Sequence, residues 1–464
     1  MNNEFTAGTV APNGTGLFGW TRDINRNQWL TYWAAFGGWT LDAMDLLLYI
    51  YALSKIKATF SLSDTEAAWL FGVTLAASAI GGAVFGIISD YIGRIHALTL
   101  SIMMYSVFTG LSAFAPNVEF FLVCRFLLGL GMGGEWASGE VLVAESWPRQ
   151  HRGKVIGMVQ SGWGVGYIIA AILAIAILPH ADFMLPLPWG GDVFIHSWRV
   201  LFLVGILPAF LIFYIRRHVE EPEVWKKMSD MRKAKKLTER GQQFTLMQLF
   251  NRGIIRYTIT ATVLTSFCMI AYWGLNTWIP TYLASPIERG GAGLGLVKGY
   301  SWTIVINIGA FLGCITFGMI SDKFGRRPVF IGYLLMTALL VPLFGSIDKI
   351  HLFLGGAVPI TLIMFVLNPL LGFFGTGFYS GFGAIMSEIF PTSSRGTAQG
   401  FSYNVGRGAS ALAPALFAGV QGMFILGHRV GYGLSLATAS IFAVLAAITI
   451  LTLPETKGKK LDVE

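Results

Sequence analysis

Six charged side chains lie deep inside long apolar segments of this sequence, and they are the first candidates for chemistry. They are Asp42, Asp45, Arg125, Glu135, Glu140 and Arg407. A charge inside a membrane-spanning helix costs about 2.5–3.5 kcal/mol on insertion scales, so each such residue indicates a function. No histidine lies in the interior of these segments, and a proton carrier among them would therefore be a carboxylate.

Asp42 and Asp45 are three residues apart, so they share one face of a helix. A rise of about 1.5 Å per residue places Asp42 near the middle of its segment. Two neighbouring carboxyls in a low-dielectric environment cannot both ionise cheaply, so one of them should keep its proton. This arrangement is typical of a proton-coupling site. The alternative is a pair of structural acids that are permanently matched with a base.

Glu135 follows the glycine-rich run 131–134 and shares its segment with Glu140. Glycine allows close helix crossing, and at such a crossing Glu135 could relay a proton inward. A hydrogen bond that only serves the packing is the alternative. Glu140 lies nearer the end of the segment, and we expect it to belong to a charge network there.

Arg407 lies near the middle of its segment without an obvious acidic partner. A guanidinium can hold a carboxylate with two parallel hydrogen bonds, so we predict that Arg407 binds a substrate carboxylate. The alternative is a structural role with backbone carbonyls or tyrosine hydroxyls. Further candidates for a substrate site are Arg125, Gln160, Tyr403, Asn404, Asn276, Tyr379 and Tyr272. Packing or interface roles are expected for Trp136, Trp163, Trp273 and Trp278.

The composition indicates a membrane protein. The 464 residues are 54% hydrophobic and only 12% charged, whereas soluble domains carry about 25% charged residues. The net charge of +8 comes from basic residues that gather between the apolar segments. A nucleic-acid-binding protein would need an exposed basic face, which this pattern does not supply.

No enzyme signature accompanies these segments. Cys124, Cys268 and Cys314 lie in apolar runs without a CxxC pair, so neither disulfides nor a zinc site is predicted. The sequence contains no phosphate-binding loop, metal-ligand cluster or nucleophile motif. We therefore expect no catalytic residue, no metal and no cofactor.

Twelve apolar windows have the length of membrane-spanning helices, since a bilayer core of ~30 Å needs about 20 residues. They are 29–54, 66–91, 95–115, 118–144, 152–178, 198–216, 256–285, 297–321, 327–346, 355–387, 395–423 and 430–452. The predicted organisation is an N-terminal tail 1–28, a bundle 29–216, a basic linker 217–255, a second bundle 256–453 and a tail 454–464.

Basic residues set the expected orientation. They concentrate in the linker 217–255 and in the turns 92–96 and 322–327, while the loop 179–197 has no Lys or Arg. Because cytoplasmic loops carry the positive charge, the linker and both termini should be cytoplasmic. Residues 1–26 lack the features of a cleavable signal peptide. We expect a multi-pass protein of a bacterial inner membrane, with the lipid bilayer as its surroundings.

The two halves repeat one another, in the same order along the chain. Residues 86–94 (GIISDYIGR) return as 318–326 (GMISDKFGR), residues 145–153 as 388–396, and Pro222-Glu223 as Pro454-Glu455. An acid and a base on a tight turn could bond helix ends across the seam between the halves and bias two states. The predicted gating residues are Gly86, Asp90, Gly93, Arg94, Glu145, Arg152, Gly318, Asp322, Gly325, Arg326, Glu388 and Arg395.

The doubled G-x-x-x-D-x-x-G-R turn resembles the motif of the major facilitator superfamily. The resemblance implies an all-α membrane protein of 12 helices, in two six-helix bundles around a central cavity that opens alternately to either side. We expect the monomer to be the functional unit. Spans one and four are neighbours in that fold, so an ion pair between Asp45 and Arg125 is reasonable, either structural or as a gate.

Finer resemblances point to organic acids. Residues 39–45 (WTLDAMD) resemble the first helix of fungal lactate/pyruvate:proton permeases. The Gly134-Glu135 pair and residues 145–148 are similar to sialic acid:proton symporters, and the two first-helix acids to aromatic-acid:proton symporters. The resemblance implies a proton symporter of a small organic acid, with a monocarboxylate such as lactate or pyruvate as the leading candidate. A sialic or aromatic acid, or a neutral sugar or polyol, is the alternative cargo.

Overall fold

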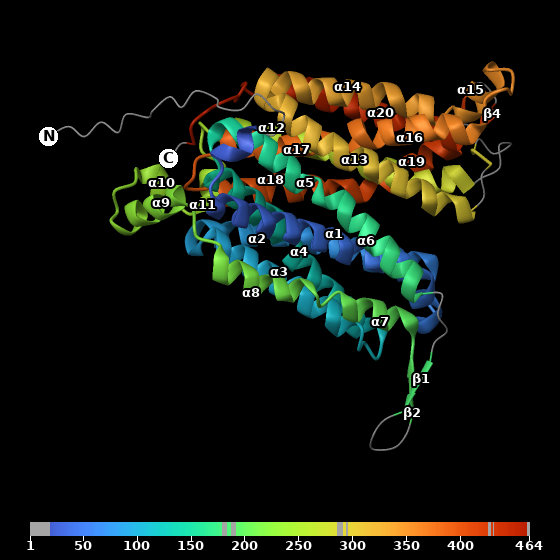
Figure 1. Cartoon of the computed structure of the whole chain (residues 1–464), viewed down its shortest axis with the longest axis horizontal. Helices are drawn as coiled ribbons and strands as arrows, with labels where there is room; N and C mark the ends of the chain where they lie inside the picture. The colour runs from blue at the N-terminus through green and yellow to red at the C-terminus, as the bar shows by residue number, and fades with distance from the viewer. Residues whose placement is uncertain are drawn as a thin grey trace.

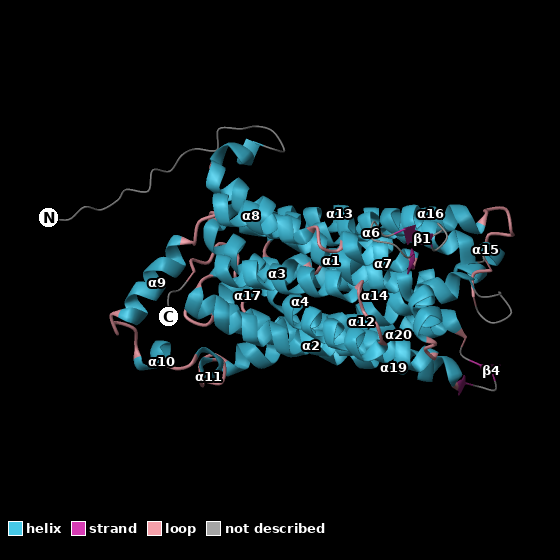
Figure 2. Cartoon of the chain, turned by 90° about the horizontal axis from the view of Figure 1, so that it is seen from below, coloured by secondary structure: helices cyan, strands magenta, loops and turns pink. Residues whose placement is uncertain are grey.

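Long helices run side by side along the molecule, and short connections join them at its two ends (Figure 1). The computed structural model describes residues 19–178, 183–186, 192–284, 291–293, 296–425, 428–429 and 431–461. Part of the predicted loop 179–197, including His180 and Asp182, lies outside these residues. Figure 2 shows the same arrangement from below, with helices making up nearly all of the described chain.

The described part of the first half contains eight α-helices and two short 3-10 helices. Its elements are η1 (Gly19–Asp23), α1 (Arg26–Phe60), α2 (Asp64–Ile92), α3 (Arg94–Ser112), α4 (Val118–Ser146), η2 (Arg149–His151), α5 (Arg152–Gln160), α6 (Gly162–Ile177), α7 (Ser197–Val204) and α8 (Pro208–His218). The predicted span 152–178 is thus divided into α5 and α6, and 198–216 into α7 and α8. Between α6 and α7, strands β1 (Phe183–Pro186) and β2 (Asp192–Ile195) pair antiparallel.

The linker forms three short helices, and the second half repeats the long ones. The linker helices are α9 (Glu223–Lys233), α10 (Glu239–Gln242) and α11 (Thr245–Gln248). The second half contains α12 (Ile255–Ala284), α13 (Leu296–Phe324), α14 (Arg326–Phe344), α15 (Ile347–Phe353), α16 (Ile360–Gly377), α17 (Ser380–Ile389), α18 (Arg395–Ala409), η4 (Ser410–Leu412), α19 (Ala413–Gly422), β3 (Phe424–Ile425), β4 (His428–Arg429), α20 (Tyr432–Thr449) and η5 (Ile450–Thr452). We call the end that holds α9–α11 the linker end, and the opposite end, with β1 and β2, the hairpin end (Figure 1).

Local sequence explains where the helices begin and turn. Asn25 and Ser63 cap α1 and α2, each with a side-chain oxygen that accepts the amide of the third helical residue. Gly93 and Gly325 make the tight α2–α3 and α13–α14 turns with φ of +126° and +107°, a region that favours glycine. The two repeated motifs therefore form the same turn twice.

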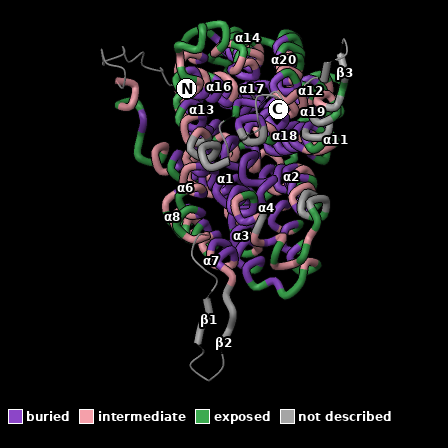
Figure 3. The backbone as a smooth tube through the Cα atoms, turned by 90° about the vertical axis from the view of Figure 1, so that its right-hand side faces the viewer, coloured by how far each residue is buried: buried purple, intermediate pink, exposed green. Residues whose placement is uncertain are grey.

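Ten helices or helix pairs among the described residues are long and apolar enough to cross a membrane. With α1 and the α18–α19 segment they make the twelve spans that the sequence predicts. Large apolar side chains such as Phe213, which is 73% exposed, cover the outer helix faces, while buried residues fill both bundles (Figure 3). Such an apolar exterior suits a lipid environment rather than water.

The two most extensive helix contacts between the halves are those of α2 with α18 and of α13 with α5. The pairs are equivalent under the internal repeat. Glycine makes the approach possible, because a Cβ on Gly86 would lie 2.5 Å from the carbonyl oxygen of Gly396. We refer to this contact region between the bundles as the seam.

Candidate functional site

A cavity of about 320 Å³ lies between the two halves. The first half contributes Trp39 from α1, Gln160 from α5 and Trp163 from α6. The second half contributes Met269, Tyr272, Trp273, Thr376, Tyr379, Tyr403 and Arg407. The cavity therefore combines a single base with six aromatic rings.

Arg407 lies in the last turn of α18, is 2% exposed and borders the cavity. Its Nη2 has no hydrogen-bond partner in the described structure. Tyr403, one helical turn earlier, borders the same cavity, so α18 presents a guanidinium and a phenol on one face. An unpaired buried donor of this kind is ready to bind an anion.

Asp42 is fully buried on α1 and interacts electrostatically with Arg407. Neither of its carboxyl oxygens accepts a hydrogen bond in the described structure, and no ion pair joins it to Arg407. Trp39, which precedes it by three residues, borders the cavity. Asp42 itself does not line the cavity, but it lies in the opposite half from Arg407 and close enough to interact with it electrostatically without a direct ion pair.

Asp45 points away from this site. Its Oδ2 accepts a hydrogen bond of 2.8 Å from Thr109 on α3. The expected ion pair with Arg125 is not formed, because the Arg125 guanidinium donates to Ser112 at 3.0 Å instead. That guanidinium also packs against the rings of Phe121 and Phe202, with its Cζ 5.1 and 4.8 Å from their centroids. Asp45 and Arg125 interact electrostatically only over a longer distance.

Other predicted substrate residues separate into two groups. Gln160, Tyr379, Tyr403 and Tyr272 line the cavity. Asn276 and Asn404 do not: the Asn276 amide donates to the backbone of Tyr272 at 2.9 Å, and the Asn404 amide donates across the seam to Gly133 O at 3.2 Å. Arg125 also lies outside the cavity lining.

The tryptophans that line the cavity are not predicted from the sequence as site residues. Trp163 and Trp273, which were expected to serve packing, border the cavity together with Trp39, Met269 and Thr376. Trp163 Nε1 donates to the Tyr272 hydroxyl at 3.0 Å and so connects the halves. A usable signal was the spacing of Trp39 from Asp42, which places both on one helix face.

A stacked aromatic pair, Trp136 of α4 and Tyr403 of α18, lies beside the cavity. The rings of Trp136 and Tyr403 lie 3.6 Å apart between centroids, at an interplanar angle of 14°. Trp136 Nε1 also donates to Gln160 Oε1 at 3.2 Å. Since Trp136 belongs to the first half and Tyr403 to the second, this stack spans the seam beside the cavity.

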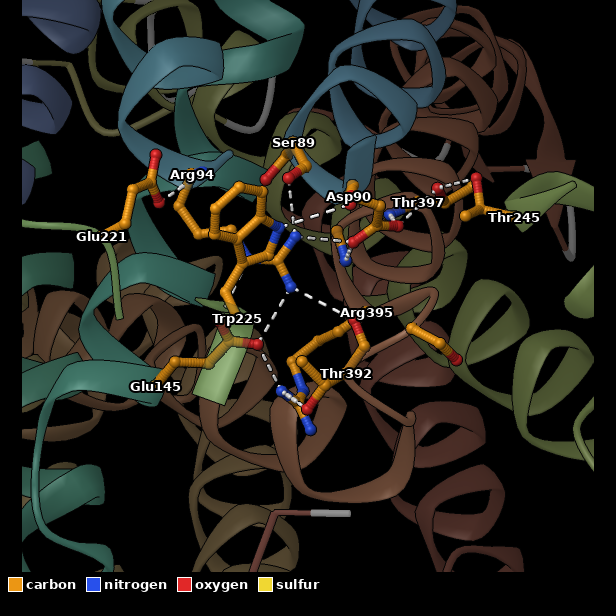
Figure 4. Close-up of polar contacts among 12 residues, drawn as sticks. Ser89, Asp90, Arg94, Glu145, Glu221, Trp225, Thr245, Thr392, Arg395 and Thr397 are labelled. Carbon is orange, nitrogen blue, oxygen red and sulfur yellow. Dashed lines mark hydrogen bonds and ion pairs between the residues drawn. The ribbon is translucent and has the colours of Figure 1, made fainter. Parts of the chain in front are cut away.

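At the linker end, the predicted gating residues of the α2–α3 turn form one buried network (Figure 4). Arg94 donates to Asp90 at 2.7 Å and to both oxygens of Glu145 at 3.0 Å. Asp90 accepts the amides of Gly396 and Thr397 from the other half, and Arg395 donates to Glu145. These bonds join the two bundles at the seam.

The repeated turn builds the matching network on the other side. Arg326 donates to Asp322 at 2.6 Å and to Glu388 at 3.2 Å, and Arg152 of the first half donates to Glu388 at 3.1 Å. Asp322 accepts the amides of Gly153 and Lys154. Gly318, like Gly86, lies where the neighbouring backbone leaves no room for a Cβ.

One pairing of the repeat needs correction. The sequence aligned Glu223 with Glu455, but Glu223 is exposed and pairs only with Lys226. The residue that matches Glu455 is Glu221. Glu221 accepts the amides of Arg94 and Ile95, at 2.9 and 3.0 Å, as Glu455 accepts those of Arg326 and Arg327.

The pKa values of Glu221 and Glu455 shift in opposite directions. Burial raises the pKa of Glu221, although the amides of Ile95 and Arg94 oppose that shift. Burial acts on Glu455 too, but its four backbone N–H donors outweigh it and lower the pKa of that carboxyl. Both cap a helix N-terminus, where free amides favour an anion.

Glu135 and Glu140 are both buried, and none of their four carboxyl oxygens has a hydrogen-bond partner in the described structure. The expectation that Glu140 joins the charge network at the linker end is therefore wrong. The arginines of that network are matched by Glu145 and Glu388 instead. Burying a carboxyl without a hydrogen-bond partner is costly, so both groups call for an explanation.

Comparisons with known proteins agree with this geometry. A sequence model of the Major Facilitator Superfamily matches residues 29–369 and 299–463. A putative metabolite transport protein of Haemophilus influenzae is 32% identical over 95% of this chain and 100% of the relative. A probable 4-methylmuconolactone transporter of Cupriavidus pinatubonensis is 32% identical (95% and 94%). The sialic acid transporter NanX of Escherichia coli is 30% identical (94% and 96%).

Among solved structures, the proton:xylose symporter XylE bound to 6-bromo-6-deoxy-D-glucose superposes with a TM-score of 0.72. The match covers 94% of this chain and 98% of that one, at 21% sequence identity. At this identity the likeness concerns the fold, which is the two-bundle arrangement of twelve spans predicted from the repeat.

Proposed function

Because the chain belongs to the Major Facilitator Superfamily, and is thus an integral membrane transporter rather than an enzyme, we propose that it is a proton-coupled symporter of a small organic acid anion. The observation that carries this proposal is Arg407, whose Nη2 has no partner in the described structure, at a ring-lined cavity between the halves. The unpartnered carboxyl of Asp42 interacts with it electrostatically. The proposed setting is a bacterial inner membrane, with the linker end cytoplasmic.

Arg407 supplies the recognition of the anion. Its free Nη2 can donate to a carboxylate, and a second guanidinium N–H can complete a bidentate pair. The relatives support an acid as cargo, since one is named as a probable 4-methylmuconolactone transporter and another as a sialic acid transporter. An anion at Arg407 also removes the cost of an unpaired buried cation.

The lining selects among acids. Six aromatic side chains border the cavity. Lactate or pyruvate would satisfy Arg407 but offer these rings no planar partner, whereas a flat ring acid would stack on them. Within the class of monocarboxylates, the alternative of an aromatic or other planar ring acid therefore fits this cavity better than lactate.

Asp42 supplies the coupling. When Asp42 is protonated and an anion is bound at Arg407, the net charge of the site is close to zero. The loaded protein can then change from opening on one side of the membrane to opening on the other. Entry of an anion against a negative-inside potential costs about 2.3 kcal/mol per 100 mV, and a co-transported proton cancels that cost. Glu135 is the proposed next proton acceptor, and the two networks of the linker end hold the closed state.

The test is proton entry into proteoliposomes that contain a pH-sensitive dye. Benzoate, lactate, pyruvate, a sialic acid and a hexose are added outside, and protein-free liposomes measure the passive entry of undissociated acids. We expect protein-dependent internal acidification with an acid and none with the hexose. Uptake of the hexose with no acid-driven proton entry would contradict the proposal and identify a neutral-solute carrier.

A further inference from the structure

Glu140 is a buried acid for which the proposed symport has no role. It borders a second cavity of about 140 Å³, together with Ala35, Trp39, Glu135, Trp136, Gly139 and Val159. Trp39 also borders the central cavity, so this small cavity lies between the proposed substrate site and Glu140. Both its acids lack hydrogen-bond partners in the described structure, so two unsatisfied carboxyls border one small cavity.

The two glutamates of α4 face different partners. A Cβ on Gly38 of α1 would overlap Glu135 Oε1, and Gly38 lies one turn before Asp42. A Cβ on Gly383 of α17 would overlap Glu140 Oε2. Glu135 therefore lies against α1 beside Asp42, whereas Glu140 lies across the seam against the other half of the molecule.

Among the described residues, no base forms an ion pair with Glu140. The titratable groups that interact with it are Glu135 on its own helix, Cys314 on α13 and Tyr403 on α18, none of which is a base. Neither of its oxygens accepts a hydrogen bond in the described structure. A bare carboxylate in such a place is strongly unfavourable, so the closed seam accommodates Glu140 only as the neutral acid.

We propose that Glu140 is a second proton-carrying residue, which must be protonated for the linker end to close and which releases its proton to water when the seam opens there. Asp42, Glu135 and Glu140 then form three successive carboxyl positions from the substrate site to the seam. This step rests on the proposed proton symport. It adds that proton release and opening of the linker end are one event, because opening exposes the carboxyl that closure keeps neutral.

The experiment measures opening of the linker end without any cargo. Spin labels are attached at Ile92→Cys on α2 and Phe324→Cys on α13, two exposed positions at the linker ends of opposite halves. The buried Cys124, Cys268 and Cys314 are replaced by alanine in this background, whose transport is checked first. Label-to-label distances are then recorded by pulsed electron resonance across a pH series.

With Glu140 intact, we expect the population with the long distance to grow as the pH rises. Glu140→Gln, which stays neutral at every pH, should remain closed throughout, with at least a tenfold smaller open population at the alkaline end. Glu140→Ala removes the same group and gives the same expectation should the glutamine variant fold poorly. Glu119→Gln, an exposed glutamate at the other end of α4, is the matched control and should open as wild type does.

Opening of Glu140→Gln over the same pH range as wild type would overturn the proposal and make Glu140 a packing residue. A failure of this proposal can be distinguished from a failure of the proposed proton symport. The dye assay fails when no acid drives proton entry, whereas the distance assay fails when the seam does not respond to the charge of Glu140.

Discussion

At the residue scale, the two acids of the first helix have different surroundings. Asp42 has free carboxyl oxygens and interacts with Arg407, whereas Asp45 is held by Thr109. The two positions are only about 60° apart around the helix axis, so the neighbouring helices decide the difference: Thr109 of α3 bonds Asp45, whereas Arg407 of α18 interacts with Asp42. We therefore propose that Asp42, rather than Asp45, is the proton-coupling residue of the pair.

The first prediction concerns this assignment. Asp42→Asn should abolish acid accumulation driven by a proton gradient but keep the exchange of labelled for unlabelled acid, because exchange needs no net proton movement. Asp45→Asn should still accumulate the acid, since an amide oxygen can accept the Thr109 hydroxyl. Both activities are measured in proteoliposomes. Accumulation by Asp42→Asn, or its loss in Asp45→Asn alone, would reverse the assignment.

The second prediction concerns Arg407. Arg407→Ala should weaken acid binding by about 10- to 100-fold, because a hydrogen bond to a charged group contributes roughly 1.5–3 kcal/mol. The dissociation constant is measured by calorimetry on purified protein. Asn276→Ala is the control, because the Asn276 side chain bonds its own helix and does not border the cavity. Equal affinities in wild type and Arg407→Ala would exclude the guanidinium as the anion site.

At the scale of elements, the helices that carry the site are the least typical membrane spans. α1 and α18 are not among the ten described helices or helix pairs that are long and apolar enough to cross a membrane. α1 carries Asp42 and Asp45, and α18 is a 15-residue helix with Arg407 in its last turn. The seam elements α2, α5, α13 and α18 depend instead on glycine contacts and on capped helix ends.

The third prediction tests the corrected repeat pairing. Glu221→Ala should destabilise the protein by about 1 kcal/mol, the usual cost of losing a helix cap, because the amides of Arg94 and Ile95 lose their acceptor. Glu223→Ala, two residues away and exposed, should leave stability unchanged. Thermal unfolding in detergent at neutral pH compares the two. A larger loss for Glu223→Ala would restore the original alignment of the repeat.

At the scale of the whole molecule, the linker forms hydrogen bonds with both halves. Arg232 of α9 donates to the carbonyl oxygen of Asp90 in the first half at 3.0 Å and to that of Ser393 in the second at 2.8 Å. Trp225 donates to the same Asp90 carbonyl, and Thr245 of α11 accepts the hydroxyl of Thr397 (Figure 4). The linker thus bridges the halves beside the Asp90 network, and the C-terminal tail does so beside the mirrored one, where Arg152 donates to Lys459 O at 3.3 Å and Thr456 donates to Glu388 at 2.6 Å.

The fourth prediction follows from the two Arg232 hydrogen bonds. Arg232→Ala should favour opening of the linker end by roughly tenfold, because two charge-assisted hydrogen bonds across the seam are lost. Lys227→Ala, an exposed base on the same helix, should have no effect. The spin-label pair at positions 92 and 324 reports the open population at fixed pH. An unchanged population in Arg232→Ala would show that the linker does not hold the seam.

Much of this molecule could be predicted from the sequence. Apolar windows, basic loops and the doubled motif predicted the membrane helices, the six-plus-six organisation and the superfamily, and these expectations are confirmed. They could be predicted because they depend on composition and spacing within short stretches of chain. The domain boundaries and the cytoplasmic position of the termini stay predictions.

The partners of the buried charges were decided only by the tertiary structure. It placed Arg407 on the cavity and Arg125 in an aromatic cage, and it left Glu140 unpaired against Gly383. The sequence by itself determined which residues are charged, on which span they lie and at what approximate depth. It could not determine what they touch, because a helical position fixes a side chain's direction only about its own helix axis. The neighbour on that side belongs to another helix, whose place is set only when the chain folds.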